Sequence, residues 1–99
     1  MKVLLINGSP NEFGCTYTAL SEARKVFEQN GIETEIITVG DKEVSGCNVC
    51  CACTKLGKCI KDDIVNELIE KIENADGVVI GSPVYYASLN GTLKAILDR

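Results

Sequence analysis

The first strand-like segment sets the strongest limit on the fold. Val3 to Ile6 is an uninterrupted apolar run that ends at Asn7-Gly8-Ser9-Pro10, a composition typical of a turn. An apolar run without alternation is typical of a strand buried on both faces, as in a parallel sheet with helices on either side. The chain is therefore expected to form an α/β fold around this strand.

Helix-like and strand-like segments alternate along the rest of the chain. Apolar residues follow helical spacing over residues 16–27, and a β-branched stretch at residues 32–39 suits a strand near an edge. A helix is expected after the acidic pair Asp62-Asp63, and a third strand at residues 78–80. A last helical pattern rests on four apolar residues, Leu89, Leu93, Ile96 and Leu97. The order β-α-β-loop-α-β-α predicts a parallel sheet with right-handed crossovers.

The predicted sheet is small. Three strands are few for a parallel sheet, so we expect this chain to be the N-terminal portion of a longer one, or to be completed by another protomer. The 99 residues allow one domain.

Composition excludes several classes of function. Ten Lys and Arg against fourteen Asp and Glu give a net charge of −4, which does not suit a surface that binds nucleic acid. The absence of histidine removes Ser-His-Asp triads, histidine zinc sites and histidine-bound haem. Because no stretch reaches the length of a signal peptide or a membrane span, we expect a cytoplasmic protein that does not act in a membrane.

Five of the six cysteines gather in a loop of about twenty residues after Gly40. Four of them, Cys47, Cys50, Cys53 and Cys59, follow the pattern C-x2-C-x2-C-x5-C, and this clustering indicates metal binding, not disulfides. Three thiolates two residues apart can surround one face of a cubane cluster, and a fourth can bind the remaining iron. We therefore favour an iron–sulfur cluster over zinc, which is more often held by two separated C-x2-C pairs, and over redox-active or idle thiols.

The remaining cysteines and the lysines of this loop allow simpler interpretations. Cys15 and Cys51 are interpreted as ordinary small or buried thiols. Lys55, Lys58 and Lys61 are either solvated loop charges or contacts for an acidic electron-transfer partner.

Two further loops follow the first and third strands. The turn from Gly8 to Thr16 offers backbone N–H groups, the hydroxyls of Ser9 and Thr16 and a helix N-terminus, which together can hold a phosphate. The loop from Ser82 to Tyr86 brings two tyrosines. If the first and third strands are adjacent, both loops open at the carboxyl end of the sheet, where such folds bind ligands. A phosphate at one loop and a ring at the other fit a mononucleotide such as FMN; the alternatives are a turn that only starts a helix and tyrosines that serve a core or an interface.

These motifs together resemble a known family. They are Gly8-Ser9-Pro10 with Thr16, the four-cysteine pattern followed by Lys61-Asp62-Asp63, and Gly81-Ser82-Pro83-Val84-Tyr85-Tyr86 with Asp98-Arg99. The combination resembles the iron–sulfur flavoproteins, within the NADPH-dependent FMN reductase group of flavodoxin-like folds. The resemblance implies that residues 1–99 form the N-terminal portion of a flavodoxin-like FMN-binding domain, with a cluster loop at about residues 41–61.

The resemblance also implies an activity and particular site residues. Electrons would pass from ferredoxin, or a similar acidic carrier, through a [4Fe-4S] cluster and FMN to an acceptor such as dioxygen, peroxide or a quinone. The protein would be an FMN-dependent oxidoreductase that assembles as a homodimer or homotetramer. The implied cluster ligands are Cys47, Cys50, Cys53 and Cys59, and the implied FMN contacts are Ser9, Pro10, Asn11, Thr16, Pro83, Val84, Tyr85 and Tyr86.

Two other functions are kept as alternatives. One is an NAD(P)H-dependent FMN reductase without a functional cluster, which NADPH alone would reduce rapidly. The other is a zinc-stabilised, non-enzymatic binding module, which would be colourless and contain one zinc per chain.

Overall fold

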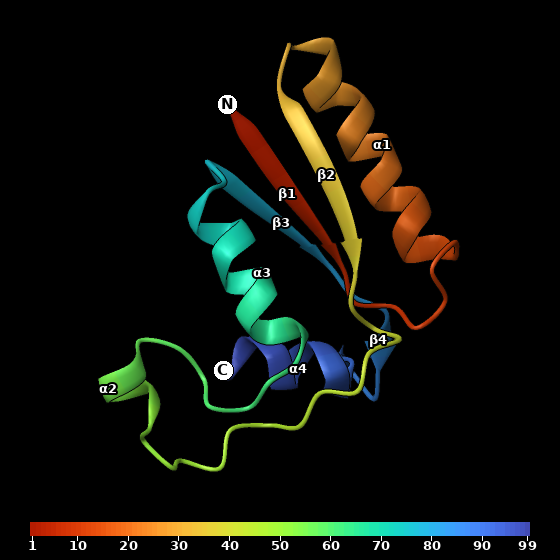
Figure 1. The fold of residues 1–99 in the computed structure, drawn as a ribbon. Helices are drawn as coiled ribbons and strands as arrows, with labels where there is room; N and C mark the ends of the chain where they lie inside the picture. Colours follow the sequence, from red (N-terminus) through yellow and green to blue (C-terminus); the bar gives the residue numbers. More distant parts are fainter.

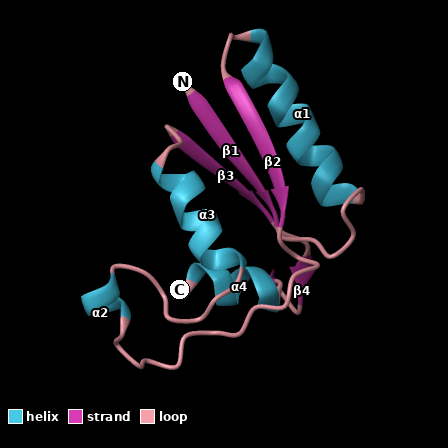
Figure 2. Cartoon of the chain, in the orientation of Figure 1, coloured by secondary structure: helices cyan, strands magenta, loops and turns pink.

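The computed structural model describes residues 1–99 and contains a three-stranded parallel sheet with helices on both faces (Figures 1 and 2). The strand order is β2-β1-β3, so the first and third strands are adjacent, which is the condition on which the sequence analysis placed a ligand site at the sheet end. The sheet strands are β1 (Lys2–Asn7), β2 (Glu33–Thr38) and β3 (Gly77–Gly81), and the crossover helices are α1 (Cys15–Gln29) and α3 (Ile64–Glu73). The other elements are α2 (Cys53–Leu56), the antiparallel pair β4 (Val84–Tyr85) and β5 (Ser88–Leu89), and α4 (Gly91–Leu97).

The central strand β1 divides its side chains between two hydrophobic cores. Val3 and Leu5 pack with Leu20 of α1 on one face. Leu4 and Ile6 face the other side and pack against buried residues of α3 and α4, namely Val65, Leu68, Leu93 and Ile96. Each of these large side chains stabilises the fold by roughly 1.5–3 kcal/mol through burial. The prediction of a strand buried on both faces is therefore confirmed.

The two edges of the sheet differ. The outer strand β2 pairs only with β1 and is half-buried over most of its length, which confirms the predicted edge strand. Strand β3 forms the other edge, where Val78 is 39 % and Ile80 45 % exposed beside an apolar hollow of about 190 Å³ between α3 and α4. An unpaired strand with exposed apolar side chains is a site for further pairing. Completion of the sheet by more chain or by another protomer stays a prediction.

One predicted helical residue lies elsewhere. Leu89 belongs to β5, and the last helix begins only at Gly91. Between β4 and β5 the chain turns at Tyr86 and Ala87, whose φ angles of 51° and 64° are both left-handed. Two successive left-handed residues form the hairpin turn that suits the twist of paired strands, a turn for which Asn and Gly are the usual sequence signals. Because those signals are absent here, the spacing of Leu89 and Leu93 predicts one helix.

The helices are short. The longest, α1, has 15 residues, and no helix combines the length and the apolar character that crossing a membrane requires.

Candidate functional site

The loops that follow β1 and β3 lie against each other at the carboxyl end of the sheet, as predicted. The Gly8 N–H donates to the Gly81 carbonyl oxygen at 2.8 Å. Gly40, which follows β2, also reaches this point: a Cβ on Gly40 would lie 2.2 Å from the Gly8 carbonyl oxygen. Only glycine fits that contact, so the start of the cysteine loop packs directly on the turn after β1.

Asn7 orders the turn after β1. Its buried side chain accepts a hydrogen bond from the Ser9 N–H at 3.0 Å and donates to the Glu12 carbonyl at 3.2 Å. Ser9 is also buried, and its hydroxyl accepts from the Asn11 N–H at 3.1 Å. A different path of the turn would break these bonds and leave buried polar groups without partners, at a cost of about 1–3 kcal/mol each. The bonds therefore fix the path of the turn.

Asn90 joins the two loops. Its side chain is buried and donates to the Gly8 carbonyl oxygen. The Ser82 hydroxyl bonds to the Asn90 side-chain oxygen at 3.3 Å and accepts from the Asn90 N–H at 3.1 Å. This role of Asn90 is not apparent from the sequence alone. An Asn directly before a helix suggests an N-cap, yet the Asn90 side chain does not cap α4.

The phosphate-binding residues predicted after β1 surround the N-terminus of α1. Pro10 and Asn11 are exposed, whereas Thr16 is half-buried in the first turn of the helix. No side chain caps α1, so the N–H groups of its first turn are open to an anion. This arrangement fits the phosphate of a mononucleotide.

The predicted ring contacts lie on the other loop and on the β4–β5 hairpin. Pro83 is half-buried, while Val84 is 78 %, Tyr85 50 % and Tyr86 104 % exposed. The three cavities of the chain lie away from these four residues, so within residues 1–99 the ring side is an open edge. The tyrosines are thus not part of the core.

The cysteine loop turns sharply between successive predicted ligands. Val49, between Cys47 and Cys50, has a φ of 59°, and Cys51, between Cys50 and Cys53, has a φ of 63°. A left-handed conformation is unusual for a β-branched residue such as valine. These two left-handed residues, only two positions apart, reverse the chain between successive predicted ligands. The short helix α2, which the sequence analysis did not predict, then begins at Cys53.

The cysteine side chains form a donor set without disulfides. All six cysteines are free, and those of the loop line one small cavity of about 90 Å³. No three Cys, Asp or Glu side chains group closely enough to hold one metal ion. A cubane cluster binds each cysteine to a different iron, so its ligands need not converge on one point, and this donor set fits it. Cys15 and Cys51 are exposed, so neither is a buried thiol, and their interpretation as ordinary small thiols stays a prediction.

Backbone N–H groups face the sulfur atoms of the first and last predicted ligands. The Val49 N–H donates to Cys47 Sγ at 3.4 Å. The Lys61 N–H and, to a smaller extent, the Arg99 guanidinium lower the pKa of the Cys59 thiol. A thiolate is the form that binds metal, so both contacts favour ligation.

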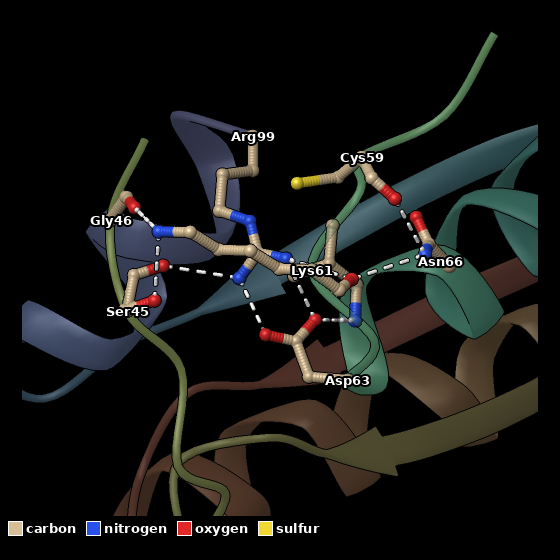
Figure 3. A network of polar contacts seen from close by, with 8 residues as sticks. Ser45, Gly46, Cys59, Lys61, Asp63, Asn66 and Arg99 are labelled. Carbon is tan, nitrogen blue, oxygen red and sulfur yellow. Dashed lines mark hydrogen bonds and ion pairs between the residues drawn. The ribbon is translucent and has the colours of Figure 1, made fainter. Parts of the chain in front are cut away.

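A polar network closes the base of the cysteine loop (Figure 3). Arg99 forms a two-pronged ion pair with Asp63, with nitrogen–oxygen distances of 2.5 and 2.9 Å. Asn66 donates to the carbonyl oxygens of Cys59 at 3.0 Å and Lys61 at 3.2 Å. Asp63 also caps α3 through the Val65 N–H. The network ties the exit of the loop to two helices.

Lys61 belongs to this network and not to a free surface. Its amine donates to the Ser45 hydroxyl at 3.0 Å and to the Gly46 carbonyl at 2.6 Å. Lys55 and Lys58 are exposed, so of the three lysines considered for docking only these two are free of such contacts.

Comparison with known proteins agrees with this geometry. A family model described as NADPH-dependent FMN reductase matches residues 1–99. An iron–sulfur flavoprotein of Methanocaldococcus jannaschii is 42 % identical over 99 residues, covering 100 % of this chain and 51 % of the relative. The chain spans about half the length of the curated relatives it matches. The resemblance to iron–sulfur flavoproteins is confirmed.

Solved structures show the same fold. A flavone reductase superposes with a TM-score of 0.79 at 25 % identity, over 100 % of this chain and 29 % of the other. RosB with bound 8-demethyl-8-formylriboflavin-5'-phosphate gives 0.75 at 26 % identity, over 98 % and 40 %. The predicted flavodoxin-like arrangement is confirmed.

Proposed function

The chain belongs to the NADPH-dependent FMN reductase family over residues 1–99, and from this premise we propose that it is an FMN-dependent oxidoreductase with a [4Fe-4S] cluster. Residues 1–99 would serve as the N-terminal portion of its FMN-binding domain, with the cluster loop at about 41–61. A single observation carries this proposal. The same short chain has two adjacent loops at the carboxyl end of its sheet, after β1 and β3, and a third loop with four cysteines. Electrons would pass through the cluster and FMN to an acceptor such as dioxygen, peroxide or a quinone.

The sheet end supports FMN binding. The uncapped N-terminus of α1 supplies N–H donors for a phosphate, with Ser9, Asn11 and Thr16 beside it. The hairpin places Tyr85 and Tyr86 at an open edge where an aromatic ring can stack. Pro10, Pro83 and Val84 complete the proposed contact set.

The cysteine loop supports the cluster. Its four predicted ligands are unpaired thiols separated by sharp turns, and two of them face backbone N–H donors. A cluster exchanges single electrons, and a flavin interconverts one-electron and two-electron steps. Free thiols suit a reducing cytoplasm, which is the proposed location.

The position of the loop bears on the assembly and the electron donor. In Figure 1 the chain leaves the end of β2, runs past α4 and reaches α2 on the side opposite to β4. The cysteines therefore lie away from the ring contacts of their own chain. We propose a homodimer or homotetramer in which the cluster of one protomer serves the flavin of another. Ferredoxin, or a similar acidic carrier, would dock near exposed Lys55 and Lys58.

Replacing Cys53 with serine tests the cluster assignment. We expect Cys53→Ser to lower the iron content from about four atoms per chain to below one, while FMN stays bound, because a cubane cluster needs four thiolates. Cys51→Ser is the matched control: this exposed thiol lies outside the four-cysteine pattern, so its iron content should not change. The iron content and the bound FMN of both variants are measured by iron analysis and absorption spectroscopy. Retention of four iron atoms with an unchanged spectrum in Cys53→Ser would contradict the assignment.

The family description favours a second candidate, direct reduction by NADPH. In that case the cysteine loop would be dispensable. Anaerobic mixing with NADPH alone would bleach the flavin absorbance at the same rate in the wild type and in Cys53→Ser. In the proposed function, rapid flavin reduction requires the cluster and a one-electron donor.

A further inference from the structure

Arg99 makes an unusually complete set of contacts at the end of α4. Its side chain is only 1 % exposed. Besides both Asp63 oxygens, its terminal nitrogens reach the Ser45 carbonyl at 3.1 Å and the Lys61 carbonyl at 3.4 Å. Ser45 precedes the first cysteine of the loop and Lys61 follows the last, so one guanidinium spans both ends.

The fifth N–H of Arg99 has no partner. The Nε atom is buried and makes no hydrogen bond, whereas the four N–H groups of the terminal nitrogens have four acceptors. Leaving a buried charged donor unpaired costs more than the roughly 1–3 kcal/mol of a neutral group. An unpaired donor of this kind indicates an acceptor that is present in the working protein.

The cysteine cavity is where that acceptor would lie. Arg99 and Cys59 line the same cavity together with the other predicted ligands. In Figure 3 the Cys59 sulfur points toward the Arg99 side chain. Sulfur atoms of an iron–sulfur cluster accept N–H hydrogen bonds, and those bonds help to set its reduction potential.

We propose that Arg99 is the positioning residue of the cluster site: its terminal nitrogens hold the two ends of the cysteine loop together, and its Nε–H donates to sulfur at Cys59. This inference rests on the proposed function, because it requires a cluster on the loop. Holding the two ends reduces the entropy that the loop loses when its thiolates gather around a metal centre. The Nε–H stabilises the additional negative charge of the reduced state, so losing it lowers the reduction potential.

Arg99→Lys is the principal test, because lysine keeps the positive charge and loses the planar fork. We expect folded Arg99→Lys to hold less iron than the wild type. In the protein that retains iron, the equilibrium constant for cluster reduction should fall at least tenfold, which is about 59 mV for one electron. Potentials are measured by anaerobic titration, with the reduced cluster followed by electron paramagnetic resonance.

Lys58→Gln controls for charge. It removes a positive charge from the same loop at an exposed position without contacts to the base, so it should keep its iron and shift the potential much less. An equal shift in Lys58→Gln and Arg99→Lys would overturn the assignment of the Nε–H.

Asp63→Asn covers the case in which Arg99→Lys does not fold. It leaves Arg99 and every cysteine in place but loosens the ion pair. Amide hydrogen exchange in the iron-free protein should then speed up at residues 45–47 and 60–62 relative to the wild type, and the potential of the loaded protein should shift in the same direction. Wild-type exchange, iron content and potential in both variants would overturn the inference. A wild type that carries no cluster would instead refute the proposed function, and the inference with it.

Discussion

The two candidate cofactor sites are built by different means. The sheet-end loops continue directly from β1 and β3, and their backbones are bonded to each other and to the buried Asn7 and Asn90. The cysteine loop packs on the domain through its first residues, among them Val44, but its cysteine-bearing part is largely exposed and is held by the polar network at its base. The difference shows that the hydrophobic core organises one site in advance, whereas the other site depends on a polar clamp and, in the proposed function, on its cluster.

This contrast has an energetic side. A site that the core organises unfolds together with the core. A substitution that destabilises the core should therefore also disturb the sheet-end site. Between Cys47 and Cys59 the loop has no buried apolar side chain, so the order of this part should change without changing global stability.

The largest effect is expected in the core. Leu5→Ala removes a fully buried side chain of β1 and should lower the free energy of unfolding by about 2–5 kcal/mol. Val49→Ala, in the exposed cysteine loop, should change it by less than about 0.5 kcal/mol. Urea unfolding followed by circular dichroism measures both. Equal effects of the two substitutions would show that the loop is part of the core, against the comparison.

A smaller effect is expected at the joint between the sheet-end loops. Asn90→Ala leaves the Gly8 carbonyl without its buried side-chain partner and removes one contact of the Ser82 hydroxyl, which should cost about 1–3 kcal/mol. FMN affinity should fall about tenfold, because a loop displacement costing about 1.4 kcal/mol has that effect. Isothermal titration with FMN gives the affinity.

Iron content provides the discriminating readout for Asn90→Ala, and it should stay at the wild-type level. The control is Asn74→Ala, whose exposed side chain bonds only to the Glu70 carbonyl of its own helix. If Asn90→Ala lost iron as well as FMN, the sheet-end site and the cysteine loop would not be structurally independent.

The smallest effect is a dependence on pH at the base of the cysteine loop. The Arg99 guanidinium is the main cause that holds the pKa of Asp63 below its ordinary value of 3.8, and Lys61 adds to the effect. Because the folded pKa is the lower one, the stabilisation is present above pH 3.8 and is lost as the pH falls through the folded value. In iron-free protein, hydrogen exchange at residues 45–47 should therefore accelerate below that pH. Asp63→Asn should not show this additional acceleration, and an identical pH profile in both proteins would argue against the clamp.

The fold could be predicted because its signals are local. The apolar run from Val3 to Ile6 is determined by burial on two faces, and the helix signals around it agree with the same sheet. The prediction that Leu89 is helical is wrong because Tyr86 and Ala87, in the turn before it, have left-handed conformations. Neither residue type is a sequence signal for such a turn. Short helix α2 was missed because four residues carry too little periodicity.

The residues that organise the sites could not be predicted in the same way. Arg99 meets Asp63 across 36 positions of sequence, and Asn90 meets Gly8 across 82. Nothing near these residues in the chain indicates such partners, because the contacts arise only when the sheet brings its carboxyl end together with α4. The cysteine spacing was informative for the opposite reason: its chemistry is contained in one short segment.

The most direct test of the central claim is the cofactor content of anaerobically purified protein. Absorption spectra are recorded together with iron, sulfide, zinc and extracted flavin per chain. Our account predicts flavin bands above a broad iron–sulfur shoulder, with one FMN and about four iron and four sulfide per chain, as a cubane held by four cysteines requires. Zinc without flavin, or flavin with no iron, would contradict it.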